Sequence, residues 1–175
     1  MVVLLLLTLL LISYGIGNTR CSAVPDNSTD MLPLLDFKRA IASDPRQVLS
    51  SWNTSIPHCQ WEGVSCSLAH TGRVMALNPT GQSLQGQIAP SLGNLIFLRK
   101  LVLSSNGFSG QLPILSRLRK LQSLDLGDNH LQGFNPDALT NCSNLEYLDL
   151  SFNSITGSLP PNIGSLNSLV SVTSQ

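Results

Sequence analysis

The sequence is poor in charged residues. Only 11% of its 175 residues are Asp, Glu, Lys or Arg, and ten of each sign leave a formal net charge of zero. Proteins that follow a nucleic-acid backbone carry clustered positive charge, so this balance argues against nucleic acid as a partner. Intrinsic disorder is also disfavoured, because 42% of the residues are apolar and disordered chains lack that content.

Aromatic residues and catalytic signatures are scarce as well. Aromatic side chains make up 5% of the sequence, and no Gly-x-Ser-x-Gly nucleophile motif occurs. The histidines, His58, His70 and His130, are spread along the chain, and Gly15-x-Gly17 lies in an apolar leader rather than in a phosphate-binding loop. We therefore expect a protein without enzymatic activity and without a cofactor.

Leucine is abundant, with 33 residues, and the N-terminus explains part of this number. Residues 2–12 form an apolar run interrupted by Thr8, and small residues follow it. This pattern is typical of a secretory signal peptide, which we assign to residues 1–23, with cleavage after Ala23 or Gly17. No positive residue precedes the run, so a signal anchor is the alternative.

Export would make the asparagine-rich sequence a target for glycosylation. Three acceptor sequences, Asn-x-Ser/Thr, begin at Asn27, Asn53 and Asn141. Asn78 is not an acceptor, because Pro79 occupies the middle position of its triplet.

From Val74 onward the sequence repeats. The first apolar position of the pattern Leu-x-x-Leu-x-Leu-x-x-Asn falls at residues 74, 98, 121, 145 and 169, in steps of 24, 23, 24 and 24. This period predicts an α/β leucine-rich repeat solenoid with parallel strands on its concave face. Residues 73–175 would hold four full repeats and the start of a fifth. The asparagine column should turn the chain and bond the neighbouring coil; it consists of Asn106, Asn129 and Asn153.

Residues 24–72 form a different unit, which we interpret as the cap that a solenoid needs at its first coil. Asp30 is predicted to begin a helix that ends near Ala42, before Asp44-Pro45. The Cys59-x6-Cys66-x3-His70 segment superficially offers zinc ligands. However, the spacing is not a usual zinc-finger spacing, and export would place the cysteines in an oxidising compartment. We therefore predict a Cys59–Cys66 disulfide and no metal. Cys142 occupies a leucine position and should be a buried free thiol.

Several sequence motifs make the chain similar to plant leucine-rich repeat receptors. The cap resemblance rests on Leu34-Leu35-Asp36-Phe37-Lys38, Leu49-Ser50-Ser51-Trp52-Asn53 and Cys59-x-Trp61-x-Gly63-Val64-x-Cys66. Residues 73–175 resemble the plant-specific repeat, which implies a second short sheet. Thr140-Asn141-Cys142-Ser143-Asn144-Leu145 resembles immune-type receptor kinases of grasses.

The resemblance implies an extracellular recognition module that acts in defence or development. It would bind a peptide or protein ligand and a leucine-rich repeat co-receptor, at the cell surface or in the secretory pathway. Membrane attachment and kinase activity would belong to regions beyond this truncated chain. The alternatives are a secreted inhibitor of a pathogen cell-wall-degrading enzyme and a non-functional receptor gene fragment.

Solenoids bind partners with the outward side chains of their concave strands. The repeat pattern selects six candidates for this face: Lys100, Val102, Ser123, Asp125, Tyr147 and Asp149. We interpret Tyr147 as an anchor, the two aspartates as solvated surface residues, and Phe152 as a packing residue in a turn.

Pro79 aligns with Leu103, so residues 76–84 contain the first strand rather than a linker. A proline there is tolerable if its missing N–H would have faced the cap. Together with Gln82 in the asparagine column and Asn135 in an apolar column, Pro79 indicates drift from the repeat.

Overall fold

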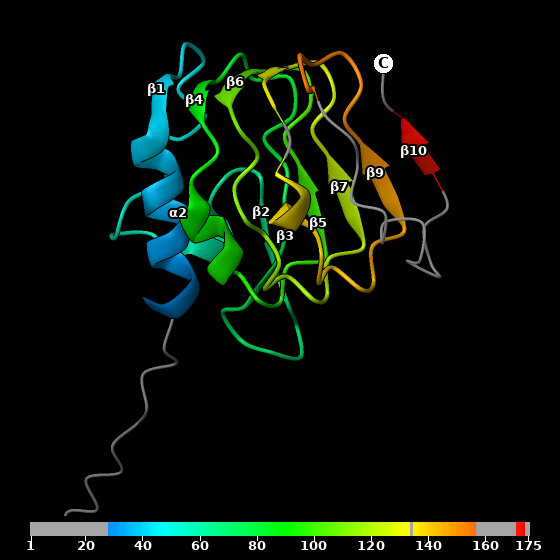
Figure 1. Ribbon diagram of the computed structural model, residues 1–175. Coiled ribbons are helices and arrows are strands. Elements are labelled where there is room, and N and C mark those ends of the chain that lie inside the picture. Colours follow the sequence, from blue (N-terminus) through cyan, green and yellow to red (C-terminus); the bar gives the residue numbers. More distant parts are fainter. Residues whose placement is uncertain (1–27, 134, 157–170, 174–175) are drawn as a thin grey trace, which may run out of the picture.

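The computed structural model describes residues 28–133, 135–156 and 171–173 and shows two sheets that run along a solenoid beside an N-terminal helix (Figure 1). The larger sheet has the spatial order β10-β9-β7-β5-β3-β2, and the smaller one has the order β1-β4-β6-β8. The predicted fold, a leucine-rich repeat solenoid with concave parallel strands, a second short sheet and a helical cap, is confirmed.

The larger sheet follows the repeat that the sequence predicts. Its strands are β2 (Val64–Cys66), β3 (Val74–Leu77), β5 (Lys100–Val102), β7 (Ser123–Asp125), β9 (Tyr147–Asp149) and β10 (Ser171–Thr173). Paired residues in successive parallel strands are Ala76, Lys100, Ser123, Tyr147 and Ser171, which reproduces the steps of 24, 23, 24 and 24. Strand β2 comes from the cap and pairs antiparallel to β3. We number the coils from β3, so the first coil is 74–97, the second 98–120, the third 121–144 and the fourth 145–168.

The inward side chains of these strands form the core. Four leucines, one from each coil, are 0% exposed: Leu77, Leu101, Leu124 and Leu148. Successive side chains of a strand point to opposite faces, so the residues on either side of each leucine point outward from the solenoid. Full burial of one leucine side chain contributes about 2 kcal/mol, so the stack is a main source of stability.

The second sheet joins the cap to the repeats. Its strands are β1 (Ile41–Ser43), β4 (Gln85–Gln87), β6 (Gly107–Gly110) and β8 (His130–Leu131). Strand β1 belongs to the cap and pairs antiparallel to β4, where Ile41 lies opposite Gly86. A Cβ atom on Gly86 would lie 2.3 Å from the Ala40 carbonyl oxygen, so only glycine permits this approach. Short 3-10 helices complete connections in the described residues: η1 (His58–Gln60), η2 (Pro90–Asn94) and η3 (Pro136–Ala138).

The cap helix differs from the prediction at both ends. Helix α2 spans Ser28–Ala40, so Asp30 lies inside its first turn rather than before it, and Ile41 leaves the helix for strand β1. The Asp30 side chain is buried and accepts a hydrogen bond from the Val74 backbone N–H at 2.7 Å. The bond from Asp30 to Val74 at one end, and the pairing of Ile41 with strand β4 at the other end, therefore prevail over the local helical pattern. No helix in the described part of the chain is long and apolar enough to cross a membrane.

Aromatic side chains hold the cap against the coils. Trp52 stacks on Trp61 with ring centroids 5.3 Å apart, and Phe37 lies 6.0 Å from Trp52. Phe37 also lies 5.8 Å from Phe108 in β6, so the aromatic cluster extends from the cap into the second coil. Each indole N–H has a backbone acceptor, Glu62 for Trp52 and Ile56 for Trp61. The burial of these large rings therefore leaves no indole N–H unpaired.

The asparagine column makes the bonds that the sequence predicts. Asn129 donates to the carbonyl of Leu103 in the preceding coil at 3.0 Å and to the carbonyl of Leu126 in its own coil at 3.0 Å. Its carboxamide oxygen accepts from the Phe108 N–H at 3.0 Å. Asn106 and Asn153 repeat this arrangement. The column thus satisfies backbone groups that the turn removes from the sheets.

The residues interpreted as drift have structural roles in two of three cases. The Gln82 carboxamide donates to the Thr80 carbonyl at 3.0 Å, the same bond to the residue two before it that each ladder asparagine makes. Asn135 accepts from the Asp137 N–H at 2.9 Å and caps helix η3. Both residues therefore make local hydrogen bonds although they depart from the residue type of their columns.

Pro79 remains irregular, but not in the way expected. At the equivalent positions, Leu103 donates its N–H to the Asp125 carbonyl at 2.8 Å and Leu126 donates to the Asp149 carbonyl at 2.9 Å. Both acceptors belong to the next coil. The hydrogen bond that proline removes therefore faces the second coil, so the condition given for its tolerance, an N–H that faces the cap, is not met.

Candidate functional site

Pairing of strands β5, β7 and β9 brings the six candidate residues into two rows. Lys100, Ser123 and Tyr147 form the first row, at the beginning of the strands. Val102, Asp125 and Asp149 form the second row. Lys100 and Tyr147 are exposed, whereas Val102 is only 7% exposed and therefore offers little surface to a partner.

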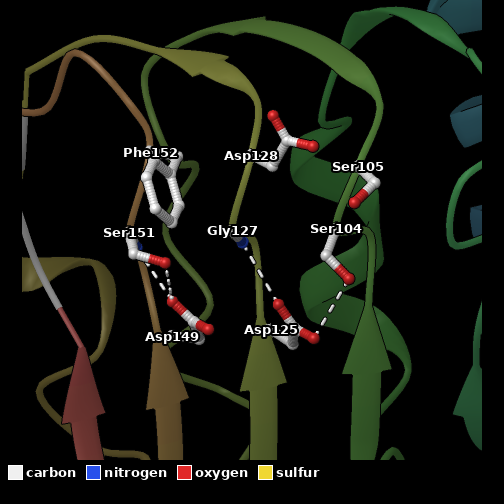
Figure 2. A pocket seen from close by; sticks show the side chains of 8 residues that line it. All are labelled: Ser104, Ser105, Asp125, Gly127, Asp128, Asp149, Ser151 and Phe152. Carbon is white, nitrogen blue, oxygen red and sulfur yellow. Dashed lines mark hydrogen bonds between the residues drawn. The ribbon is translucent and has the colours of Figure 1, made fainter.

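A hollow of about 550 Å³ lies where these strands end (Figure 2). Three successive coils contribute residues at equivalent positions, so the hollow follows directly from the repeat. Its lining consists of Ser104, Ser105, Asp125, Gly127, Asp128, Asp149, Ser151 and Phe152. We call this set the acidic pocket.

Hydrogen bonds hold the two central carboxylates of the acidic pocket. Ser104 Oγ donates to Asp125 Oδ2 at 3.0 Å, and the Gly127 N–H donates to Asp125 Oδ1 at 3.1 Å. The Ser151 hydroxyl and N–H donate to Asp149 Oδ1 at 2.6 and 2.9 Å. Both aspartates are half-buried, so they are positioned groups rather than the solvated surface residues that the sequence indicated.

The chain places two like charges side by side at this site. Asp125 and Asp149 are directly paired in adjacent strands, an arrangement that destabilises a sheet. A Cβ atom on Gly127 would lie 3.3 Å from Asp149 Oδ1, so glycine leaves room for the second carboxylate. Carboxylates accept hydrogen bonds on several lone pairs and pair favourably with cationic groups.

Tyr147 extends the acidic pocket along strand β9. Its hydroxyl donates to Asp149 Oδ2 at 3.2 Å, and its side chain is 37% exposed. Partial burial, the negative charges of Asp149 and Asp125, and this hydrogen bond all raise the pKa of Tyr147. The tyrosine therefore remains a neutral hydrogen-bond donor beside the acids.

Phe152 is the residue that sequence reasoning assigned wrongly. Gly81, Ser105, Asp128 and Phe152 occupy one column of the repeat and have φ values of 65°, 54°, 55° and 52°. Such values suit glycine and are strained for a bulky side chain. Phe152 does not pack in the turn as expected, since it is 70% exposed beside the acidic pocket. Comparison of this variable column across repeats would have revealed it.

Acidic and basic residues are segregated along the chain, and the acidic segment includes the aspartates of the acidic pocket. No lysine or arginine follows Lys120, and five acidic residues lie between positions 125 and 149. Conversely, residues 63–124 contain six cationic and no acidic residues. Residues 125–149 are therefore an acidic segment of the solenoid, and the preceding part of the solenoid is basic.

The cysteines and glycosylation candidates lie away from the acidic pocket. Cys59 and Cys66 are joined in a disulfide, so the cluster that they form with His58 has no free thiolate for a metal. Cys142 is buried, and burial raises its pKa to about 11, which makes it an inert thiol. Asn53 and Asn141 are exposed, and Asn27 lies outside the described residues.

Two family descriptions match most of the chain. The leucine rich repeat N-terminal domain matches residues 27–67, and the leucine rich repeat matches residues 96–155 and 119–172. The LRR receptor-like serine/threonine-protein kinase EFR of Arabidopsis thaliana is 47% identical over 98 residues, which are 55% of this chain and 9% of that protein. The chain spans 8% to 14% of the length of the most similar curated relatives.

Solved ectodomains share the fold. The BIR2 ectodomain of Arabidopsis thaliana superposes with a TM-score of 0.73 at 36% identity, over 80% of this chain and 76% of that chain. The Arabidopsis receptor kinase HAESA, solved with the peptide hormone IDA and the co-receptor SERK1, gives 0.71 at 32% identity, over 83% and 25%. This chain belongs to the family of leucine-rich repeat ectodomains of plant receptor kinases.

Proposed function

We propose that the chain is an extracellular recognition module that binds a peptide or protein ligand on its concave face. The single observation that carries this proposal is the acidic pocket, where two positioned carboxylates lie beside a strained, exposed aromatic ring. Strained residues of this kind cluster at functional sites. The HAESA structure with a peptide hormone supports a peptide as the kind of ligand.

The chemistry of the acidic pocket selects a basic group of the ligand. A lysine or arginine side chain would place its charge between Asp125 and Asp149 and its aliphatic stem against Phe152. Cation–π attraction to the Phe152 ring adds to this contact. A leucine-rich repeat co-receptor such as SERK1, which binds HAESA, is the second partner that we propose.

The cellular setting follows from the same proposal. Residues 1–23 would direct the chain into the secretory pathway, and Asn27, Asn53 and Asn141 would carry glycans outside the cell. The module would then act in defence or developmental signalling as part of a longer receptor. Membrane attachment and any kinase activity would reside in other parts of that receptor, and the chain itself would not be an enzyme.

Peptide selection tests the proposal directly. A random peptide library is selected on the chain, secreted from a eukaryotic host, and the selected peptides are measured on variants. Asp125→Asn with Asp149→Ala should weaken them by at least about tenfold, because two charge-assisted contacts are lost. The matched control, Asp137→Asn with Glu146→Gln, removes the same charge outside the acidic pocket and should change affinity less than about twofold. Failure to select any peptide, or equal losses in both variants, would refute the proposal.

A further inference from the structure

A second cluster lies at the opposite end of the concave strands, where the chain enters them. Arg73, Phe97 and Lys120 occupy one column of the repeat, each directly before the start of a coil, since the paired strands are offset by 24 and then 23 residues. The Arg73 guanidinium lies 4.5 Å and the Lys120 ammonium 3.8 Å from the centre of the Phe97 ring. One aromatic ring is therefore flanked by a cation one repeat period before it and a cation one repeat period after it.

The ring borders a cavity of about 490 Å³. Its lining includes Leu68, His70, Met75, Phe97, Arg99 and Lys120. The His70 ring approaches Phe97 edge-on with centroids 4.8 Å apart, and Leu68 is fully exposed. We call this set the basic pocket. None of the described residues that line it is acidic.

The cations in and beside the basic pocket differ in whether they already have an acidic partner. Arg73 is committed to the cap, since its guanidinium forms an ion pair of 2.9 Å with buried Asp30. Arg99 and Lys120 have no carboxylate within ion-pair distance among the residues that the structure describes. Two cations from the two ends of the second coil thus face one cavity, an arrangement whose repulsion a bound anion would relieve.

We propose that the basic pocket binds an acidic side chain of a peptide. Arg99 and Lys120 would donate charge-assisted hydrogen bonds to its carboxylate, and Leu68 and Met75 would contact a neighbouring apolar residue of the peptide. Arg73 and Lys120 lie over the Phe97 ring and His70 approaches it edge-on, so the ring holds these cations and the imidazole around the cavity. This assignment is independent of the acidic pocket, which lies at the other end of the strands.

A peptide fits this cavity better than an acidic sugar does. Sugars stack on the faces of aromatic rings, and the Phe97 faces are covered by Arg73 and Lys120. The exposed Leu68 and the thioether of Met75 also favour an apolar side chain over a hydroxyl-rich ring. The anionic group is therefore assigned to a glutamate or aspartate flanked by an apolar residue.

Fluorescence anisotropy at low salt tests the inference with a defined probe. An acetylated, labelled hexapeptide of alternating glutamate and leucine residues should bind the full chain at least about tenfold tighter than the same peptide with glutamine. Arg99→Gln with Lys120→Gln should weaken binding of the glutamate peptide at least about tenfold. The matched control, Arg117→Gln with Arg119→Gln, lowers the charge equally outside the basic pocket and should cost less than about twofold.

Two further arms separate the alternatives. Asp125→Asn with Asp149→Ala should bind the glutamate peptide with unchanged affinity. The test of the basic pocket is therefore separate from the test of the proposed function. Phe97→Leu keeps an apolar side chain at this position and should weaken peptide binding by about threefold through loss of the ring. Equal affinity for the glutamate and glutamine peptides, equal losses in the two double variants, or stronger binding of tri-galacturonate than of the peptide would overturn the inference. Melting curves establish that each variant is folded.

Discussion

Asp30 and Val74 lie 44 residues apart and are joined by a hydrogen bond of 2.7 Å between the carboxylate of one and the backbone N–H of the other. Both residues are fully buried. Arg73 completes the contact with a hydrogen bond of 3.1 Å and an ion pair of 2.9 Å to the same carboxylate. The first strand of the solenoid thus begins on a charged group of the cap helix, and the cap and the repeats should unfold together.

Asp30→Asn should therefore destabilise the chain by roughly 2–4 kcal/mol, because the charge of Arg73 loses its buried partner. Chemical denaturation measures this change. Asp36→Asn is the matched control on the same helix; its ion pair with Arg39 is exposed and should contribute less than about 1 kcal/mol. Equal effects of the two substitutions would show that the Asp30 contact does not hold the cap.

Pro79→Leu should be neutral or should stabilise the chain by up to about 1.5 kcal/mol. The leucine supplies the N–H that proline lacks and that the other coils direct to the next coil. The substitution also makes Asn78 a glycosylation acceptor, so the protein is produced in a host that does not glycosylate. A marked loss of thermal stability in the unglycosylated protein would contradict the alignment of residue 79 with the repeat leucines.

Cys142 should make stability fall in alkaline solution. Burial raises the thiol pKa in the folded protein from 9.0 to about 11, so the folded state favours the protonated thiol. The stabilising contribution is complete below pH 9.0 and is lost as the pH rises towards 11, by on the order of 2 kcal/mol. Cys142→Ala should show a shallower decline of unfolding free energy over this range. An identical pH profile would mean that the thiol is not buried in solution.

Phe152→Gly should separate stability from binding. Glycine adopts the left-handed conformation of residue 152 without strain, which offsets its greater freedom in the unfolded chain, so stability should stay equal or rise by up to about 1 kcal/mol. Affinity for the selected peptides should fall by about fivefold or more, since the exposed ring is lost. A loss of stability greater than about 1 kcal/mol would restore the interpretation of Phe152 as a packing residue.

The repeats could be predicted from the sequence because their constraints are local and recur. Each strand leucine and each ladder asparagine has the same neighbours one coil before and after, so a fixed period implies the contacts. Helix α2 was harder, since Asp30 makes its bond to Val74 in another unit and no local pattern shows this.

The two pockets are built from columns that vary between repeats. Phe97 lies between Arg73 and Lys120 only because the coils are stacked, and Phe152 follows Asp128 and Ser105 in a column of left-handed turns. The pattern that reveals the fold treats these columns as unconstrained. Their chemistry becomes visible when residues one period apart are compared as neighbours.

The most direct test of the central claim uses a glycan to block the acidic pocket. Asp149→Asn places an asparagine two residues before Ser151 and so creates a glycosylation acceptor inside the acidic pocket. Material secreted from a glycosylating host, with glycan occupancy confirmed by intact mass, is assayed against a selected peptide. It is assayed again after treatment with an amidase that removes the glycan and converts this asparagine to aspartate, with wild-type protein treated in parallel.

The account predicts that the glycosylated variant loses the peptide and that amidase treatment returns its affinity to within about twofold of treated wild type. Unchanged affinity of the fully glycosylated variant would contradict the claim that the concave face at the ends of β5, β7 and β9 is the recognition surface.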